Sequence, residues 1–282
     1  DFEELKWLQP GLSWSPDGNK IVLAAKAGAS DALHIVDIKT KRSKKIPIDL
    51  DGVFSASWSP AGGEIVFTGN HNGSSDIYIY DLDQEKYRQI TNDIFSDSYP
   101  RWDNKGEEIV FVSDRGRYVD GKYSGRMEDH DYRQTDIYIL NTKDESIRRI
   151  TDTPDNENHP IWANTKRTIF YTSDHNGVHN LYKHSLGSHS ESNNENKSGA
   201  YAITNVLTGL QQPTISGDDN SLIFAGYSGT GWDLYSLNKP MEMSSKKIMP
   251  THYIKTRDQE DLSVADIRDT DNIDRLDMDD KG

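Results

Sequence analysis

Short segments rich in β-branched and aromatic residues, separated by polar turn-forming residues, follow one another along most of the chain. One set of four comprises residues 55–58, 64–68, 76–81 and 87–91. Segments of this length and composition are typical of β-strands rather than helices. Between the second and third segments, Asn72-Gly73 is the dipeptide of a tight hairpin turn, because both residues tolerate positive φ. The pattern predicts antiparallel strands joined by short turns.

The set of four segments repeats along the chain. The motif Trp-Ser-Pro-Asp-Gly at Trp14 returns around Trp58 and, more loosely, around Trp102, at intervals of 44 residues, and weaker copies around Trp162 and Ile215 follow after 60 and 53 residues. The step from this position to the motif Asp-Ile-Tyr is 18 residues in four copies and 34 in the third, where the surplus lies within residues 115–134. The surplus of the fourth copy lies between residues 182 and 203, across a low-complexity run. The repeat therefore has five recognisable copies and two loop insertions.

About 44 residues holding four antiparallel strands is the signature of one β-propeller blade. We therefore predict an all-β chain, a β-propeller of four-stranded antiparallel blades. A repeat solenoid or a sandwich does not explain four hairpin-type links in each period. The propeller is expected over residues 1–256, and residues 257–282, with ten acidic and four basic side chains, are expected to form an acidic tail or linker. The repeats lie near residues 11–50, 55–94, 99–154, 159–207 and 212–250.

Composition narrows the class of protein. The chain has 34% hydrophobic and 28% charged residues, with a mean hydropathy of -0.80, and no apolar run is long enough to cross a bilayer as a helix. Its net charge of -14 opposes a broad grip on nucleic acid phosphates. The absence of cysteine excludes disulfides, thiolate nucleophiles and cysteine-ligated zinc. The chain starts at Asp1 without a signal region, so we expect a mature or trimmed segment of a longer protein.

The repeat motifs resemble those of the TolB-like propellers. The resemblance rests on Trp14 to Gly18, Ile65 to Phe67, Ser75 to Tyr78 and Gln89 to Thr91, and it covers most of the chain. It implies six blades, so that one blade would be degenerate or cut away. The same repeat occurs in periplasmic TolB, in prolyl-oligopeptidase-like and tricorn-like peptidases and in some sugar lyases, so it is weak for function. Residues 51–55 and 203–209 also resemble TolB-like segments that precede an outer-membrane barrel in bacterial surface proteins, which implies a periplasmic or envelope location.

Candidate binding residues follow from the geometry of a four-stranded blade. The loop between strands two and three and the link to the next blade emerge at the same end, around one mouth of the central channel. The residues expected there are Tyr99, His159 and Gln212, just before the first strands, and the hairpin residues His71, Asn72, Asp114, Arg115, Asp174 and His175. The insertion in the third repeat is expected on the same face, with Arg117, Tyr118, Tyr123, Arg126, His130 and Tyr132.

Other repeated residues have a structural interpretation. Asp76, Asp136 and Asp233, with Asn180 at the same position, are expected to cap the hairpin or bridge to the neighbouring blade. The repeated tryptophans are expected to pack between blades. No metal or cofactor is expected: His175 and His179 have the spacing of a helical zinc pair, but Asn176-Gly177 between them favours a hairpin.

Enzyme signatures are mostly absent. The nearest approach to a nucleophile elbow, residues 226–230, lacks the final glycine, and neither a phosphate-binding loop nor a His-Glu-x-x-His motif is present. We therefore expect a non-enzymatic propeller that binds a protein or peptide in the bacterial envelope, without nucleic acid and without inserting into the membrane. The alternative is the substrate-gating propeller of a peptidase, or a polysaccharide lyase with His159 and Gln212 as metal or base candidates.

Overall fold

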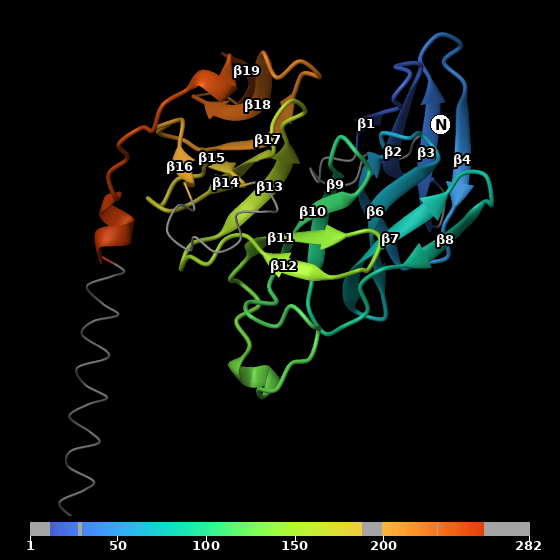
Figure 1. Ribbon diagram of the computed structural model, residues 1–282, viewed down its shortest axis with the longest axis horizontal. Helices are drawn as coiled ribbons and strands as arrows, with labels where there is room; N and C mark the ends of the chain where they lie inside the picture. The colour runs from blue at the N-terminus through green and yellow to red at the C-terminus, as the bar shows by residue number, and fades with distance from the viewer. Residues whose placement is uncertain (1–11, 28–29, 188–198, 230, 257–282) are drawn as a thin grey trace, which may run out of the picture.

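The computed structural model describes residues 12–27, 30–187, 199–229 and 231–256. Its strands form five antiparallel sheets, each built from strands consecutive in the sequence and set side by side as propeller blades (Figure 1). The five predicted repeats are thus confirmed as five blades. The acidic segment 257–282 lies outside the described residues. Within the described ranges, no helix is long and apolar enough to cross a bilayer.

Four blades have four strands and the fifth has three. Blade one comprises β1 (Ser13–Trp14), β2 (Lys20–Ala27), β3 (Ser30–Asp37) and β4 (Ser43–Pro47). Blade two comprises β5 (Gly52–Trp58), β6 (Glu64–His71), β7 (Ser74–Asp81) and β8 (Lys86–Gln89). Blade three comprises β9 (Asp97–Trp102), β10 (Glu108–Ser113), β11 (Asp136–Asn141) and β12 (Ile147–Arg149), with the 3-10 helix η1 (Met127–Asp129) in its insertion. Blade four comprises β13 (Glu157–Trp162), β14 (Thr168–Ser173), β15 (Asn180–Ser185) and β16 (Tyr201–Ala202). Blade five comprises β17 (Leu210–Ile215), β18 (Ser221–Ser228) and β19 (Gly231–Asn238), followed by the 3-10 helix η3 (Pro240–Glu242).

The repeated aspartate is hydrogen-bonded to a threonine that also repeats. In blade two, Thr91 Oγ1 donates to the Asp76 carboxylate at 3.4 Å and accepts the backbone N–H of Ile77 at 2.9 Å. The same arrangement joins Asp136 to Thr151 in blade three, and Asn180 to Thr204 in blade four. The side chain therefore joins the third strand to the end of the fourth strand of its own blade. This corrects our expectation of a hairpin cap or a bridge to the neighbouring blade for Asp76 and Asp136. The expected hairpin cap is present for Asn180, which donates to Asn176 Oδ1 and to the carbonyl of Val178, and for Asp233, which accepts from Ser228.

The core lies between blades. Each of blades two to four presents one apolar face to the blade before it and one to the blade after it. Val66 and Ile77 of blade two pack against Trp102, Ile109 and Phe111 of blade three, and all five are at most 8% exposed. In the second strands of blades two to four, β6, β10 and β14, side chains are buried on both faces. Stacking therefore buries both faces of an interior blade.

The ring of blades is open between blades five and one, which stand apart in Figure 1. Trp14 at this opening is 58% exposed, whereas Trp58, Trp102 and Trp162 are each at most 8% exposed. The prediction that the repeated tryptophans pack between blades is therefore wrong for Trp14, because no described blade precedes it. Among the described residues, blade five has three strands instead of the expected four. The described residues form five blades.

Candidate functional site

The first strand of each of blades two to five carries the same backbone irregularity. The register of β5, β9, β13 and β17 shifts at one point, and the residue there adopts a left-handed conformation. These residues are Ser55 (φ 49°), Tyr99 (φ 53°), His159 (φ 51°) and Gln212 (φ 56°). Left-handed backbone is uncommon for residues other than glycine, and three of these four precede proline, which disfavours compact conformations of the residue before it. Strain of this kind, repeated on the inner strands, marks a candidate functional site.

The structure brings two of the predicted residues together. The rings of Tyr99 and His159, from neighbouring blades, lie with centroids 4.7 Å apart at an angle of 55°. The first strands that carry them contact one another along the inner side of the blades. Gln212 occupies the equivalent bulge of the next blade. Tyr99, His159 and Gln212 therefore form a row across three consecutive inner strands. The structure places them within β9, β13 and β17, whereas the sequence placed them just before the first strands.

The hydrogen bonds of His159 define its protonation. Thr172 Oγ1 donates its hydrogen to the carbonyl of Asn158 at 3.0 Å. His159 Nδ1 lies 3.3 Å from Thr172 Oγ1, so the hydrogen between these two atoms is carried by Nδ1. The other ring nitrogen, Nε2, is then left as an acceptor. Burial, with the nearby His179 and Arg101, lowers the pKa of His159 to about 4. The ring is therefore neutral at physiological pH.

Arg101, two residues after Tyr99 in β9, joins this strand to the neighbouring blade. Its guanidinium donates to the carbonyl of Ala56 at 3.0 Å, which joins the inner strands of blades two and three. Burial lowers the pKa of Arg101 to about 10, which leaves it charged at neutral pH. Burial also raises the pKa of Tyr99, so its hydroxyl keeps its hydrogen. The row thus offers a phenol donor and a neutral imidazole acceptor, which suit a polar, uncharged ligand group.

Two predicted hairpin residues serve the framework. Asp114 accepts the backbone N–H of Ser96, and Asp174 accepts the backbone N–H of Asn156, both at 2.8 Å. Each carboxylate ties the hairpin between strands two and three to the link that enters the same blade. The prediction that hairpins and links emerge at one end is therefore confirmed, and both carboxylates are engaged there.

Arg115 is buried rather than displayed at a mouth. It is 1% exposed, pairs with both carboxylate oxygens of Asp97 at 2.7 Å, and donates to Asp93 at 3.1 Å. Asp76, Asp93 and Asp97 form the group of possible metal ligands within the described part of the chain. The Arg115 guanidinium already supplies positive charge to two of them. Burial, with the neighbouring Asp97 and Asp93, raises the pKa of Asp76 to about 7.

The predicted histidines of the hairpins lie away from this row. His71 is exposed and lies 3.9 Å from Asp51, while the left-handed Asn72 donates its N–H to the same carboxylate. His175 Nδ1 lies 2.6 Å from Asp155. The structure thus gives each hairpin histidine a carboxylate neighbour in the adjacent link.

The insertion of blade three folds into an aromatic cluster on a link residue. Tyr118, Tyr123 and His130 surround Phe95, with ring centroids 5.4–6.0 Å from it, and His130 also contacts Asp114 at 3.2 Å. Arg126 and Tyr132 are exposed, and Arg117 lies over the Tyr118 ring. Figure 1 shows η1 beyond β11 and β12, apart from β9 and β13. The insertion therefore shares a face with the links but does not reach the row of Tyr99 and His159.

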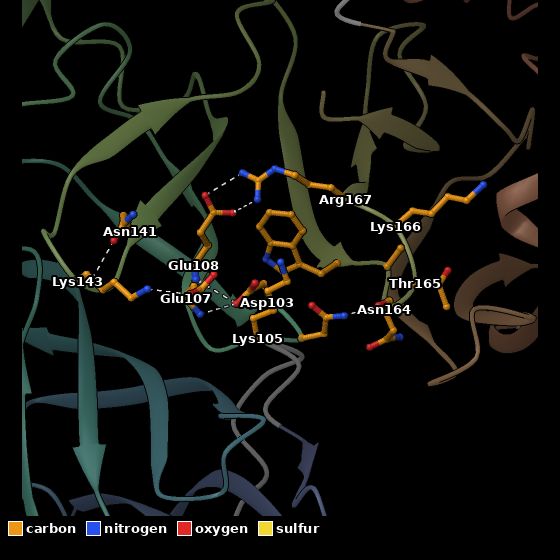
Figure 2. Close-up of a pocket in the computed structure, with 13 residues that line it drawn as sticks. Asp103, Lys105, Glu107, Glu108, Asn141, Lys143, Asn164, Thr165, Lys166 and Arg167 are labelled. Atoms are coloured by element: carbon orange, nitrogen blue, oxygen red, sulfur yellow. Dashed lines mark hydrogen bonds and ion pairs between the residues drawn. The ribbon is translucent and has the colours of Figure 1, made fainter. Parts of the chain in front are cut away.

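A hollow of about 500 Å³ lies between the turns of blades three and four (Figure 2). Arg167 pairs with both oxygens of Glu108 at 2.7 and 2.8 Å, Lys143 pairs with Glu107 at 2.8 Å, and Lys166 points away. The two blade turns meet where Asn104 donates to the carbonyl of Asn164. Glu107 and Glu108 are thus engaged with basic groups of the same hollow, and Asp103 accepts the backbone N–H groups of Glu107 and Glu108. We take it as part of the junction between blades.

Comparison with known proteins finds a propeller repeat in the same part of the chain where the sequence shows its first repeats. The family model described as the TolB beta propeller domain matches residues 7–120. The chain carries TolB-like propeller repeats. No curated protein matches it significantly.

Solved TolB structures superpose on this TolB-like propeller. TolB from Acinetobacter baumannii is 20% identical, with a TM-score of 0.64, over 82% of this chain and 51% of that protein. The putative TolB from Agrobacterium tumefaciens is 16% identical, with a TM-score of 0.64, over 81% of this chain and 76% of that protein. An oligogalacturonate lyase in complex with manganese is 12% identical, with a TM-score of 0.57, over 82% of this chain and 62% of that protein. The chain thus spans about half the length of the Acinetobacter protein, and at these identities the likeness shows the fold alone.

Sequence reasoning missed the buried charges. Asp97 and Glu157 occupy the same place in successive repeats, 60 residues apart, two residues before Tyr99 and His159. Both are at most 2% exposed. That recurrence of an acidic residue before the first strand was a signal available in the sequence. Arg101 gave no comparable signal, because nothing at its position repeats.

Proposed function

We propose that this TolB-like propeller is a non-enzymatic binding module that holds a protein or peptide over the row formed by Tyr99, His159 and Gln212. The observation that carries the proposal is the left-handed bulge, which places these side chains on three consecutive inner strands. A strained backbone fixes where a side chain points without help from the side chain itself. Three different side chains held in this way make a preorganised surface.

The chemistry of the row favours a polar peptide ligand. The neutral imidazole of His159 offers an acceptor, Tyr99 offers a donor and Gln212 carries a side-chain amide. Hydrogen-bonding groups of this kind match the N–H and C=O groups of an extended peptide. An aromatic ring beside them adds contact area, as is usual at protein interfaces.

A displayed peptide library tests the proposal. Peptides selected on the wild-type chain are measured against Tyr99→Ala and His159→Ala, with Arg126→Ala, on the exposed insertion, as the matched control. We expect both row variants to weaken binding and the control to leave it unchanged. Because the pKa of His159 is held near 4, binding should not change between pH 6 and pH 8. Peptides that bind all variants equally would place the binding surface elsewhere.

Two further features belong to this proposal. A sixth blade is proposed to fill the opening between blades five and one, since Trp14 and Leu234 present apolar surface to it. A bacterial periplasmic or envelope location is proposed because the repeat and the superposed structures are TolB-like. Turnover of an acidic polysaccharide by the purified chain with added manganese would instead favour the lyase alternative.

A further inference from the structure

The outer edge of β19 is unpaired within the described residues. In each of the other four sheets the third strand pairs with a fourth, whereas the sheet of blade five ends at β19. Edge strands of native proteins are normally protected by lysine, proline or a bulge. β19 is eight residues long, contains neither lysine nor proline, and is mostly exposed. The edge is therefore suited to one more strand.

The complete blades follow one pairing rule. A fourth-strand isoleucine lies against an aliphatic residue of the third strand: Ile46 opposite Leu33 in blade one, and Ile90 N–H donating to the carbonyl of Ile77 in blade two. The corresponding pairs of blades three and four are Ile150 with Ile137 and Ile203 with Leu181. Outside blade four, which has an insertion, the two residues are 13 positions apart. The rule therefore predicts where the fourth strand of blade five should lie in the sequence.

Residues 245–248 come within one position of this rule, with one residue more between the two strands. The equivalent of Leu33 in blade five is Leu234, and Ile248 follows it by 14 positions. The preceding residues repeat β4 without a difference, since Ser-Lys-Lys-Ile occurs at 43–46 and again at 245–248. In blade one, Lys44 lies opposite Ile35. The same register in blade five would place Ile248 opposite Leu234 and Lys246 opposite Ser236.

In the structure this segment lies against blade four instead. The N–H of Lys246 donates to the carbonyl of Ala202 in β16, and Lys183 Nζ donates to the carbonyls of Met241 and Met243. Residues 244–247 are exposed and form no strand. Ile248 is half-buried, while Ile46 at the same place in β4 is 2% exposed. The segment is thus tied to blade four at Lys246 and, just beyond it, at Met249, whose carbonyl accepts Asn176 Nδ2 at 3.4 Å.

While the segment lies on blade four, Leu234 of β19 has no fourth-strand isoleucine opposite it. It is 79% exposed, whereas Leu33, Ile77 and Ile137 are fully buried. Part of that difference comes from the opening beside blade five, and part from the absent isoleucine. Both apolar residues would be better buried if the segment paired with β19.

We propose that residues 245–248 are the fourth strand of blade five, and that they exchange between blade four and the edge of β19. Paired with β19, the segment completes the blade with Ile248 opposite Leu234. Lying on blade four, it leaves that edge open. The edge of β19 is therefore a docking surface whose occupant is this segment of the same chain.

The absence of cysteine makes the exchange directly measurable. The variant carrying Ser236→Cys and Lys246→Cys joins residues that the register places opposite each other, at a Cα separation that a disulfide spans. The matched control, Ile35→Cys with Lys44→Cys, joins the corresponding pair of blade one, which is already opposed. Under mild oxidation we expect both variants to form an intramolecular disulfide, identified by peptide mass spectrometry. A 236–246 pair that stays reduced while the 35–44 pair closes overturns the proposal, and a disulfide between Ser236→Cys residues of two molecules assigns the edge to a second copy.

A second pair of variants distinguishes docking from a role on blade four alone. Ile248→Asp, in the 236–246 background, should reduce disulfide formation severalfold, because a carboxylate cannot pack against Leu234. Met249→Asp, at the neighbouring exposed position, should leave it unchanged. If Ile248 serves only to anchor the segment to blade four, its replacement frees the segment and disulfide formation rises instead, which contradicts the proposal.

Discussion

Blades two and five have the same strand pattern and opposite environments. Val66 and Ile77 of blade two are fully buried, while Ile223 and Leu234, at the same places in blade five, are 42% and 79% exposed. The sequence of a strand therefore does not decide whether its apolar face is buried. The neighbouring blade decides it, which is the general property of proteins built by stacking repeats.

The largest loss of stability in an interior blade is expected when a buried ion pair loses its cationic partner. Arg115→Met leaves the fully buried Asp97 without its bidentate partner. We expect the free energy of unfolding to fall by about 3–5 kcal/mol, because an unpaired charge remains inside the protein. Urea unfolding measures the loss.

Arg126→Met provides the matched control, since Arg126 is exposed and its pair with Glu128 lies on the surface. The expected loss there is less than about 1 kcal/mol. Equal losses for the two variants would mean that the Arg115 ion pair does not stabilise the junction between blades two and three.

Truncation of equivalent aliphatic residues sharpens the comparison itself. Ile77→Ala should cost about 2–5 kcal/mol, because it leaves a cavity between blades two and three. Leu234→Ala should cost less than about 0.5 kcal/mol in this chain, since its side chain is exposed. Thermal or urea unfolding of both variants gives the ratio. A large cost for Leu234→Ala would show that something already covers blade five.

A buried carboxyl makes the junction of blades three and four sensitive to pH. Burial raises the pKa of Glu157 to about 7, even though Thr153 and Ser173 donate to it. The folded state therefore holds this proton where the unfolded state has lost it, so stability falls as pH rises from about 4.5 to about 7. Glu157→Gln should remove a dependence on the order of 2 kcal/mol across that range.

Urea midpoints at pH 5 and pH 7.5 check this slope. The exposed Asp152→Asn serves as the control and should keep the wild-type dependence. A Glu157→Gln variant with the wild-type slope would place the titrating group elsewhere.

The next loss of stability is expected for the threonine that joins the third strand of a blade to the end of the fourth. Thr151→Val removes the hydroxyl that accepts the Ile137 N–H and donates to Asp136. We expect a loss of about 1–3 kcal/mol, since a buried N–H is left without an acceptor. Chemical unfolding measures it against Thr214→Val, at an exposed position of β17. Equal effects at both sites would contradict a special role for the end of the fourth strand.

The repeat could be predicted because the interactions that define a blade are local in sequence. The turn after Trp58 and the pairing of Ile90 with Ile77 involve residues within one period. The exposure of Trp14 could not be predicted, because it depends on whether a blade stands before it. The burial of Arg115 depends on its pairs with Asp93 and Asp97, and it could not be predicted because the equivalent hairpin positions of blades two, four and five carry no arginine. Tyr99 and His159 could be placed together because both occupy one position of the repeat.

The bulge on the inner strands separates backbone shape from side-chain identity. The same left-handed turn carries serine, tyrosine, histidine and glutamine in four successive blades. Because the backbone holds that shape with any of the four, a substitution at one blade need not disturb the others. The inner strands therefore present one variable side chain per blade at a fixed backbone position, so that the surface of the row can change in sequence while its backbone stays the same.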